Sequence, residues 1–182
     1  GMFDDNRPLP DYDASVHTPQ HIALARRLAE ESAVLLKNEG HLLPLSLESL
    51  RSVALIGPNA DRVQFGDYTW SRSNADGVTL RQALEARCGK QVAVRYAQGC
   101  DLVSDDTTGI AQAVEAARDA DVSIVVLGSA SASLARDYSG ATCGEGFDLS
   151  DLTLTGAQET LLRRVQATGR PVVLVLLSGK PF

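Results

Sequence analysis

Glu145 stands between two glycines in the stretch Cys143-Gly-Glu-Gly-Phe-Asp148. A carboxyl group can give up and take back a proton, and glycine on either side permits backbone conformations, including positive φ, that other residues avoid. The pattern can therefore hold a carboxylate at an unusual angle at the far end of a loop. It brings mobility as readily as placement, so these residues alone also fit a solvated loop carboxylate.

The loop over residues 65–77, FGDYTWSRSNADG, contains the chain's single tryptophan, Trp70, beside Tyr68 and Arg72. Trp and Tyr in a polar loop suit stacking on the apolar face of a sugar ring, where the surrounding hydroxyl groups can be hydrogen-bonded. The alternative is that Trp70 closes the edge of a sheet, and the residues alone favour neither interpretation.

The loop over residues 129–148 runs for about twenty residues without apolar periodicity. A loop of that length inside a compact domain is usually functional or disordered. Besides Glu145, it contains three further residues that are candidates for shaping the loop or contacting a ligand: Arg136, Asp137 and Tyr138.

The elements that position these loops follow from apolar runs rich in Val, Ile and Leu. These runs predict four strands, over residues 52–58, 91–99, 121–129 and 171–179. Helices are predicted between them, over residues 79–87, 106–120 and 155–168. The alternation predicts an α/β fold, a three-layer α/β/α sandwich with a mostly parallel sheet. Functional loops leave the carboxyl ends of such strands, here after Pro58, Gly128 and Gly179.

Local signals predict where the helices begin. Thr18-Pro19 is typical of an N-cap followed by the first helical residue, and the helix that it opens is predicted to end at Gly40. Two pairs have the spacing of a capping box: Thr79 with Gln82, and Thr155 with Gln158.

The domain organisation follows from the same patterns. Residues 1–17 are polar and rich in Pro and Asp, which predicts a linker or an extended arm. Residues 18–182 are predicted to form the sandwich domain. Because the apolar run of residues 171–179 would be an aggregation hazard at a sheet edge, we expect the domain to be truncated at its C-terminus, as a piece of a longer protein.

Composition excludes several classes of partner. The chain has 182 residues, of which 44% are apolar, as in one soluble globular domain. Its net charge of −6 and its unclustered Lys and Arg argue against nucleic acid or an anionic membrane as a partner. It contains no apolar run of about 20 residues, the length of a membrane span, and no signal-peptide pattern. The compartment stays unassigned, since a targeting signal would lie upstream.

Cofactor motifs are absent from the sequence. The strand that ends in LIGPNAD is not followed by G-x-G-x-x-G, and the chain contains neither a phosphate-binding P-loop nor a Gly-x-Ser-x-Gly elbow. The cysteines and histidines lack metal-ligand spacing, so no metal site is predicted. Free thiols are the ordinary interpretation of Cys88, Cys100 and Cys143, although a disulfide between Cys88 and Cys100 stays open.

The order of the motifs resembles a known family. The pieces LARRLAEESAVLLKNEGHLLPL, VALIGPNAD, GDYTW, GEGFDLSDLTLTGAQETLLRRV and PVVLVLLSGKPF follow one another as in the second domain of glycoside hydrolase family 3, the β-glucosidases and β-xylosidases. The piece ESAVLLKNEGHLLPL is the most specific, and GMFDDNRP resembles the segment that leaves the first domain. The resemblance covers essentially the whole chain and makes residues 1–17 an interdomain linker.

The resemblance implies a retaining, exo-acting β-glycosidase, most simply a β-glucosidase, with β-xylosidase as the alternative. A (β/α)8-type barrel domain, absent from this chain, would supply an aspartate nucleophile. Glu145 matches the family's general acid/base. The two carboxyl groups of a retaining enzyme lie about 5–5.5 Å apart. We therefore expect the 182 residues alone to be inactive.

The resemblance also implies contacts with the β-linked oligosaccharide or glycoside substrate. The expected substrate-binding residues are Trp70, Tyr68, Arg136, Asp137, Tyr138 and Asp148. The arginine that commonly follows this aspartate in the family is replaced by Leu149, so the ion pair or sugar contact of that arginine is in question. No cofactor or metal is implied.

Two hypotheses of other classes remain, a non-catalytic small-ligand-binding domain and an interaction scaffold. Sugar affinity of the isolated domain would favour the first, and affinity for a protein surface would favour the second. Glucose or xylose specificity, linkage preference and oligomeric state, a dimer included, are left open by the sequence.

Overall fold

The computed structural model of the protein describes residues 3–4, 11–69, 76–132 and 140–182. The chain divides into two compact units, Gly1–Leu43 and Pro44–Phe182. In the described ranges, no helix combines the length and the apolar character that crossing a membrane requires.

The first unit contains helices α1 (Tyr12–Ser15) and α2 (Pro19–Glu31) and the 3-10 helix η1 (Glu39–His41). The predicted start of α2 is confirmed, since the Thr18 hydroxyl accepts a hydrogen bond from the amide of His21 at 3.2 Å. The predicted end at Gly40 is wrong, because α2 ends at Glu31.

Two local hydrogen-bond patterns explain why α2 stops early. The hydroxyl of Ser32 donates to the carbonyl of Ala29 and competes with the helical pattern. Further along, the side-chain amide of Asn38 pairs with both backbone groups of Leu43, at 2.8 and 3.0 Å. Gly40 serves a separate turn there, with φ +75°.

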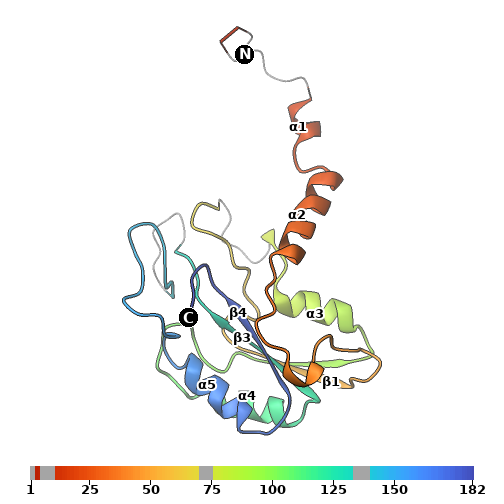
Figure 1. Cartoon of the computed structure of the whole chain (residues 1–182), viewed down its shortest axis with the longest axis vertical. Coiled ribbons are helices and arrows are strands. Elements are labelled where there is room, and N and C mark those ends of the chain that lie inside the picture. The colour runs from red at the N-terminus through yellow and green to blue at the C-terminus, as the bar shows by residue number, and fades with distance from the viewer. Residues whose placement is uncertain (1–2, 5–10, 70–75, 133–139) are drawn as a thin grey trace. The chain divides into compact units, whose positions relative to one another are not determined.

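The second unit is built around one sheet of four parallel strands in the order β2-β1-β3-β4 (Figure 1). The strands are β1 (Ser52–Ile56), β2 (Ala93–Ala97), β3 (Val122–Gly128) and β4 (Val172–Leu177). Three helices accompany them: α3 (Leu80–Cys88), α4 (Ile110–Arg118) and α5 (Gln158–Gln166). Each predicted strand is confirmed within one or two residues at either end.

Each face of the sheet carries its own apolar core, because successive strand residues point to opposite faces. Ile56 and Leu127 pack with α4 and α5 on one face. Leu55 and Val126 pack with α3 and with Leu45, Leu47 and Leu50 on the other. The predicted three-layer α/β/α sandwich is confirmed.

The two predicted capping boxes have different outcomes. That of α3 is confirmed, since the Thr79 amide donates to Gln82 Oε1 and the Gln82 amide donates to Thr79 Oγ1, at 2.9 and 3.1 Å. That of Thr155 and Gln158 is wrong, because α5 begins at Gln158 itself.

The side chain of Gln158 instead forms hydrogen bonds with the end of β3. This side chain is fully buried, accepts a hydrogen bond from the Gly128 amide at 2.9 Å and donates to the Gly128 carbonyl at 3.1 Å. Gly128 has φ +132°, and a Cβ there would lie 2.1 Å from the Leu177 carbonyl oxygen. The end of β3, where the 129–148 loop begins, is therefore fixed by α5 and β4.

Candidate functional site

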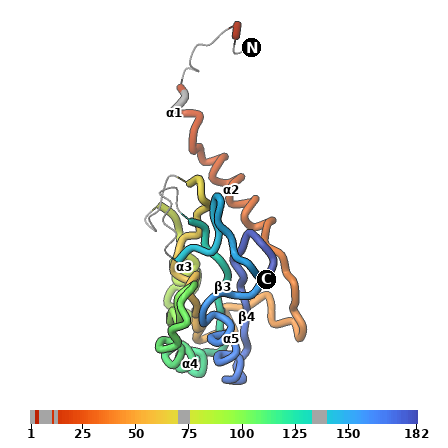
Figure 2. The backbone as a smooth tube through the Cα atoms, turned by 90° about the vertical axis from the view of Figure 1, so that its left-hand side faces the viewer, coloured from red at the N-terminus to blue at the C-terminus, as the bar shows by residue number. Residues whose placement is uncertain are grey.

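The loops that follow β1 and β3 lie at the same end of the sheet in both views (Figures 1 and 2). This is the carboxyl end of the parallel strands. Asn59, after β1, donates from its side chain to the carbonyl of Ser129, after β3, at 3.2 Å. The Ser129 hydroxyl in turn donates to that of Ser178, after β4, at 3.1 Å. A continuous polar network thus joins three strand ends.

Glu145 lies at the tip of a tight hairpin. The Gly144 amide donates to the Phe147 carbonyl at 2.9 Å, and the Phe147 amide donates to the Gly144 carbonyl at 3.1 Å. Gly146 completes the tip with φ +73°, a conformation that strongly favours glycine. The hairpin leaves the Glu145 side chain exposed.

The hairpin has a firm base on its N-terminal side. Thr142 is fully buried, its amide donates to the Ala130 carbonyl at 2.8 Å, and its hydroxyl accepts from the Ala130 amide at 3.1 Å. Ala132 donates from its amide to the Cys143 carbonyl at 2.7 Å. Gly144 packs so closely that a Cβ would lie 2.8 Å from that of Ala132. The outgoing and returning limbs of the loop are thus bound together next to Glu145.

Tyr68 meets Glu145 across the two loops. Its hydroxyl lies close enough to the Glu145 carboxylate for the two groups to interact. The negative charge of Glu145 is the largest cause that raises the pKa of the Tyr68 hydroxyl, followed by partial burial, hydrogen bonding toward Glu145 and the charge of Asp67. Tyr68 as a whole is 72% exposed, so it also offers a surface to a ligand.

Asp67 lies on the other side of Gly144. Its Oδ2 is 3.5 Å from the place that a Cβ on Gly144 would occupy. Its Oδ1 is buried and has no hydrogen-bond partner among the residues that the structure describes. Asp67 therefore lies beside the Glu145 hairpin with one carboxylate oxygen buried.

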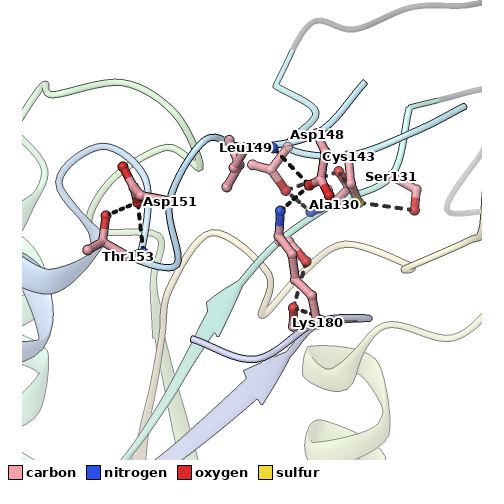
Figure 3. Close-up of polar contacts among 11 residues, drawn as sticks. Ala130, Ser131, Cys143, Asp148, Leu149, Asp151, Thr153 and Lys180 are labelled. Atoms are coloured by element: carbon pink, nitrogen blue, oxygen red, sulfur yellow. Dashed lines mark hydrogen bonds and ion pairs between the residues drawn. The ribbon is translucent and has the colours of Figure 1, made fainter. Parts of the chain in front are cut away.

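Asp148 forms an ion pair with Lys180, which follows β4 (Figure 3). The hydrogen bond from the Lys180 ammonium, together with that from the Leu149 amide, lowers the pKa of the Asp148 carboxyl. Leu149 brings no cation to this site, and the cation on Asp148 comes instead from Lys180.

In the described ranges, no group of three or more His, Cys, Asp or Glu residues is placed to hold a metal ion. Cys88, Cys100 and Cys143 are free thiols. The disulfide between Cys88 and Cys100 that the sequence left possible therefore does not form. Burial raises the pKa of the Cys100 thiol to about 11 and keeps it protonated.

Comparison with known families decides the classification. The model of the glycosyl hydrolase family 3 C-terminal domain matches residues 33–182. The chain belongs to glycoside hydrolase family 3. The family resemblance of the sequence motifs is thereby confirmed.

Relatives within family 3 match the whole chain or nearly so. A β-xylosidase of Formosa agariphila is 36% identical over 100% of this chain and 25% of its own length. A probable β-D-xylosidase of Arabidopsis thaliana is 38% identical over 100% of this chain and 23% of its own. The structure of a β-glucosidase from Erythrobacter marinus is 35% identical, with a TM-score of 0.72, over 91% of this chain and 24% of that one. The chain therefore spans about a quarter of the length of these family 3 proteins.

Among the predicted site residues of this family 3 chain, the structure brings Tyr68 and Glu145 into contact and places Asp148 three positions beyond Glu145 in the same loop. Four of the predicted substrate-binding residues lie outside the described residues, as does Arg72: Trp70, Arg136, Asp137 and Tyr138. Their substrate-binding role stays a prediction.

Sequence reasoning missed Asp67, Thr142 and Lys180. Lys180 had a usable signal, since it follows a predicted strand at its carboxyl end. Asp67 stands next to Tyr68 in a loop already singled out, but its burial beside Gly144 had no signature in the sequence.

Proposed function

We propose that this chain is the acid/base-bearing domain of a retaining, exo-acting β-glycosidase and that Glu145 is the general acid/base. The observation that carries the proposal is the hairpin, which presents one exposed carboxylate at its tip and anchors its base through the buried Thr142. A catalytic acid needs such placement, because proton transfer requires it within hydrogen-bond reach of the glycosidic oxygen.

The nucleophile is proposed to come from a barrel domain in the rest of the protein. A retaining mechanism needs a second carboxylate about 5–5.5 Å from the first. The neighbouring described carboxylates are poor candidates, because Asp148 is paired with Lys180 and Asp67 has one oxygen buried. On this account the 182 residues alone do not hydrolyse glycosides.

In the first step, Glu145 donates its proton to the leaving oxygen while the nucleophile attacks the anomeric carbon. The Glu145 carboxylate that results can accept a hydrogen bond from the neighbouring Tyr68 hydroxyl, which orients it. In the second step this carboxylate takes a proton from water, the water oxygen attacks the anomeric carbon, and the nucleophile carboxylate leaves. Tyr68 thus holds one carboxylate oxygen and directs the other to substrate.

The substrate is proposed to be a terminal β-linked glucoside, with β-xylosides as the second candidate. The Erythrobacter structure is of a β-glucosidase, whereas the Formosa and Arabidopsis relatives carry β-xylosidase names. The two sugars differ in the exocyclic hydroxymethyl group, which residues outside this chain would have to recognise. Rates on matched aryl β-glucosides and β-xylosides choose between them.

The loops beside Glu145 are proposed to contact the sugar or its leaving group. The residues concerned are Tyr68, Trp70, Arg136, Asp137, Tyr138 and Asp148. The exposed ring of Tyr68 supports this role directly, since a ring beside the acid can stack on the departing sugar.

The test is the leaving-group dependence of Glu145→Ala in the full-length enzyme. Its kcat/KM on phenyl glycosides, whose leaving group needs a proton, is expected to fall by about 10²- to 10⁴-fold. On 2,4-dinitrophenyl glycosides, which need none, kcat/KM is expected to change little. Glu48→Ala removes another exposed loop glutamate and serves as the matched control.

An equal fall on both substrates would remove Glu145 from the acid role. Unchanged rates on phenyl glycosides would do the same.

A further inference from the structure

Lys180 joins the Glu145 loop to the central sheet. Its ammonium donates to Asp148 Oδ1, and only 17% of its side chain is exposed, against 66% for Asp148. Its backbone amide donates to the Ser178 hydroxyl at 3.1 Å, and Ser178 is bonded to Ser129. The base of the lysine is therefore fixed at the ends of β3 and β4, and its tip lies on the loop (Figure 3).

Asp148 is the first side chain after the hairpin that carries Glu145. The hairpin closes at Phe147, so whatever holds Asp148 also fixes the C-terminal limb. The Leu149 amide donates to the same oxygen at 2.8 Å, but that contact lies within the loop and ties nothing to the sheet. Lys180 thus fixes this limb of the loop to a strand end.

The two limbs of the hairpin are held by different means. The N-terminal limb is bound by Thr142, which is buried and hydrogen-bonded to both backbone groups of Ala130. The C-terminal limb is exposed from Glu145 to Asp148. Just after the hairpin, the ion pair between Asp148 and Lys180 holds it. The direction of a carboxylate at the tip depends on how both limbs are held.

We propose that Lys180 is a positioning residue for Glu145 and that it acts through Asp148. This inference rests on the proposed role of Glu145 as the acid/base. Loss of the lysine lets the C-terminal limb move and takes the Glu145 carboxyl away from the leaving oxygen. Reaction steps that need the proton then slow, while steps that need only the nucleophile are spared. Misplacement of a catalytic group by about 1 Å can cost up to a hundredfold in rate.

The experiment uses Lys180→Met in the full-length enzyme, which keeps an unbranched side chain of nearly the same length and removes its charge. We expect kcat/KM to fall about tenfold to a hundredfold on phenyl glycosides and to change little on 2,4-dinitrophenyl glycosides. Lys180→Arg is expected to restore most of the activity, because it restores the cation. Lys90→Met, at an exposed lysine in the turn after α3, is the control and should leave both rates unchanged.

Two further variants show whether the effect runs through Asp148 and Glu145. Asp148→Asn should reproduce the selective loss, and adding Lys180→Met to it should cost nothing more. In the Glu145→Ala background, Lys180→Met should have no selective effect. If Lys180→Met does not fold, Asp148→Asn alone tests the inference. The Asp148 side chain is largely exposed, so this substitution should leave folding intact.

An equal loss on both substrates, or none, in a folded Lys180→Met enzyme overturns the inference and leaves the role of Glu145 intact. Strictly additive losses in the double variant overturn it too. If Glu145→Ala itself shows no leaving-group dependence, the proposed function fails, and the inference falls with it.

Discussion

The hydroxyl of Tyr68 lies beside the carboxylate of Glu145, and this contact joins the loop after β1 to the loop after β3. Both loops leave the carboxyl end of the parallel sheet. A hydroxyl beside a carboxylate can orient it through a hydrogen bond. Tyr68 is therefore placed to act on Glu145 rather than only on a bound sugar.

Tyr68→Phe keeps the ring and removes the donor. We expect kcat/KM on phenyl glycosides to fall roughly threefold to tenfold, since the lost interaction is solvent-exposed but involves a charged group. The rate on 2,4-dinitrophenyl glycosides should be nearly unchanged. Steady-state kinetics of the full-length enzyme on both substrates measure the effect. A loss shared equally by both substrates would assign Tyr68 to sugar binding alone.

Glu145→Gln should lower the pKa of Tyr68. The negative charge of Glu145 is the largest cause of its raised value, so removing that charge brings the pKa back toward 10.0. A raised pKa in the folded state stabilises the protein fully at pH values below the ordinary pKa of tyrosine. This contribution to the free energy of unfolding is lost as the pH rises through the pKa of folded Tyr68, and the Glu145→Gln variant should lose less of it. An NMR titration of the tyrosine rings checks the shift.

Tyr96 is the internal control for that titration. Its pKa is raised mainly by burial, with smaller effects from Asp61 and Arg81, so it should not respond to Glu145→Gln. If Tyr96 moves as far as Tyr68, or if Tyr68 does not move, the contact between Tyr68 and Glu145 is contradicted.

Gly146→Ala tests the hairpin. Gly146 has φ +73°, and a Cβ added to it would meet nothing within 4 Å, so the cost is backbone strain of about 1–2 kcal/mol rather than a clash. We expect lower kcat/KM on phenyl glycosides and a milder effect from Gly146→Asn, because asparagine tolerates this conformation better. Equal effects of the two substitutions would contradict the turn geometry.

Gln158→Leu tests the support of β3. It leaves both backbone groups of Gly128 without their buried partner, which should lower the free energy of unfolding by about 1–3 kcal/mol. Gln166→Leu, at the exposed end of the same helix, is the matched control and should change it little. Urea unfolding of the 182-residue chain compares them. Equal losses of unfolding free energy in the two variants would show that the hydrogen bonds to Gly128 contribute nothing to stability.

Features with local causes could be predicted from the sequence. The strands follow from apolar runs, and the Thr79–Gln82 capping box follows from a spacing of three residues. Thr155–Gln158 has the same spacing, yet Gln158 bonds to Gly128, thirty residues away in the chain, because the buried end of β3 needs partners. A rule based on neighbouring residues cannot predict a contact with a residue so far away in the chain.

The candidate site divides in the same way. Glu145 and Tyr68 could be singled out by residue type, by flanking glycines and by position in loops. Their contact could not, because it depends on the order of β1 and β3 in the sheet. The pairing of Asp148 with Lys180 likewise depends on the end of β4 lying below the loop, and Leu149 gave no hint of it.

The most direct test of the central claim is the product that the full-length Glu145→Ala enzyme forms from a 2,4-dinitrophenyl β-glycoside in azide. Azide needs no general base, so it should attack the glycosyl-enzyme in place of water, raise kcat and yield the β-glycosyl azide. NMR of the product gives its configuration. An α-glycosyl azide, or no azide product and no rise in kcat, would contradict Glu145 as the acid/base of a retaining enzyme.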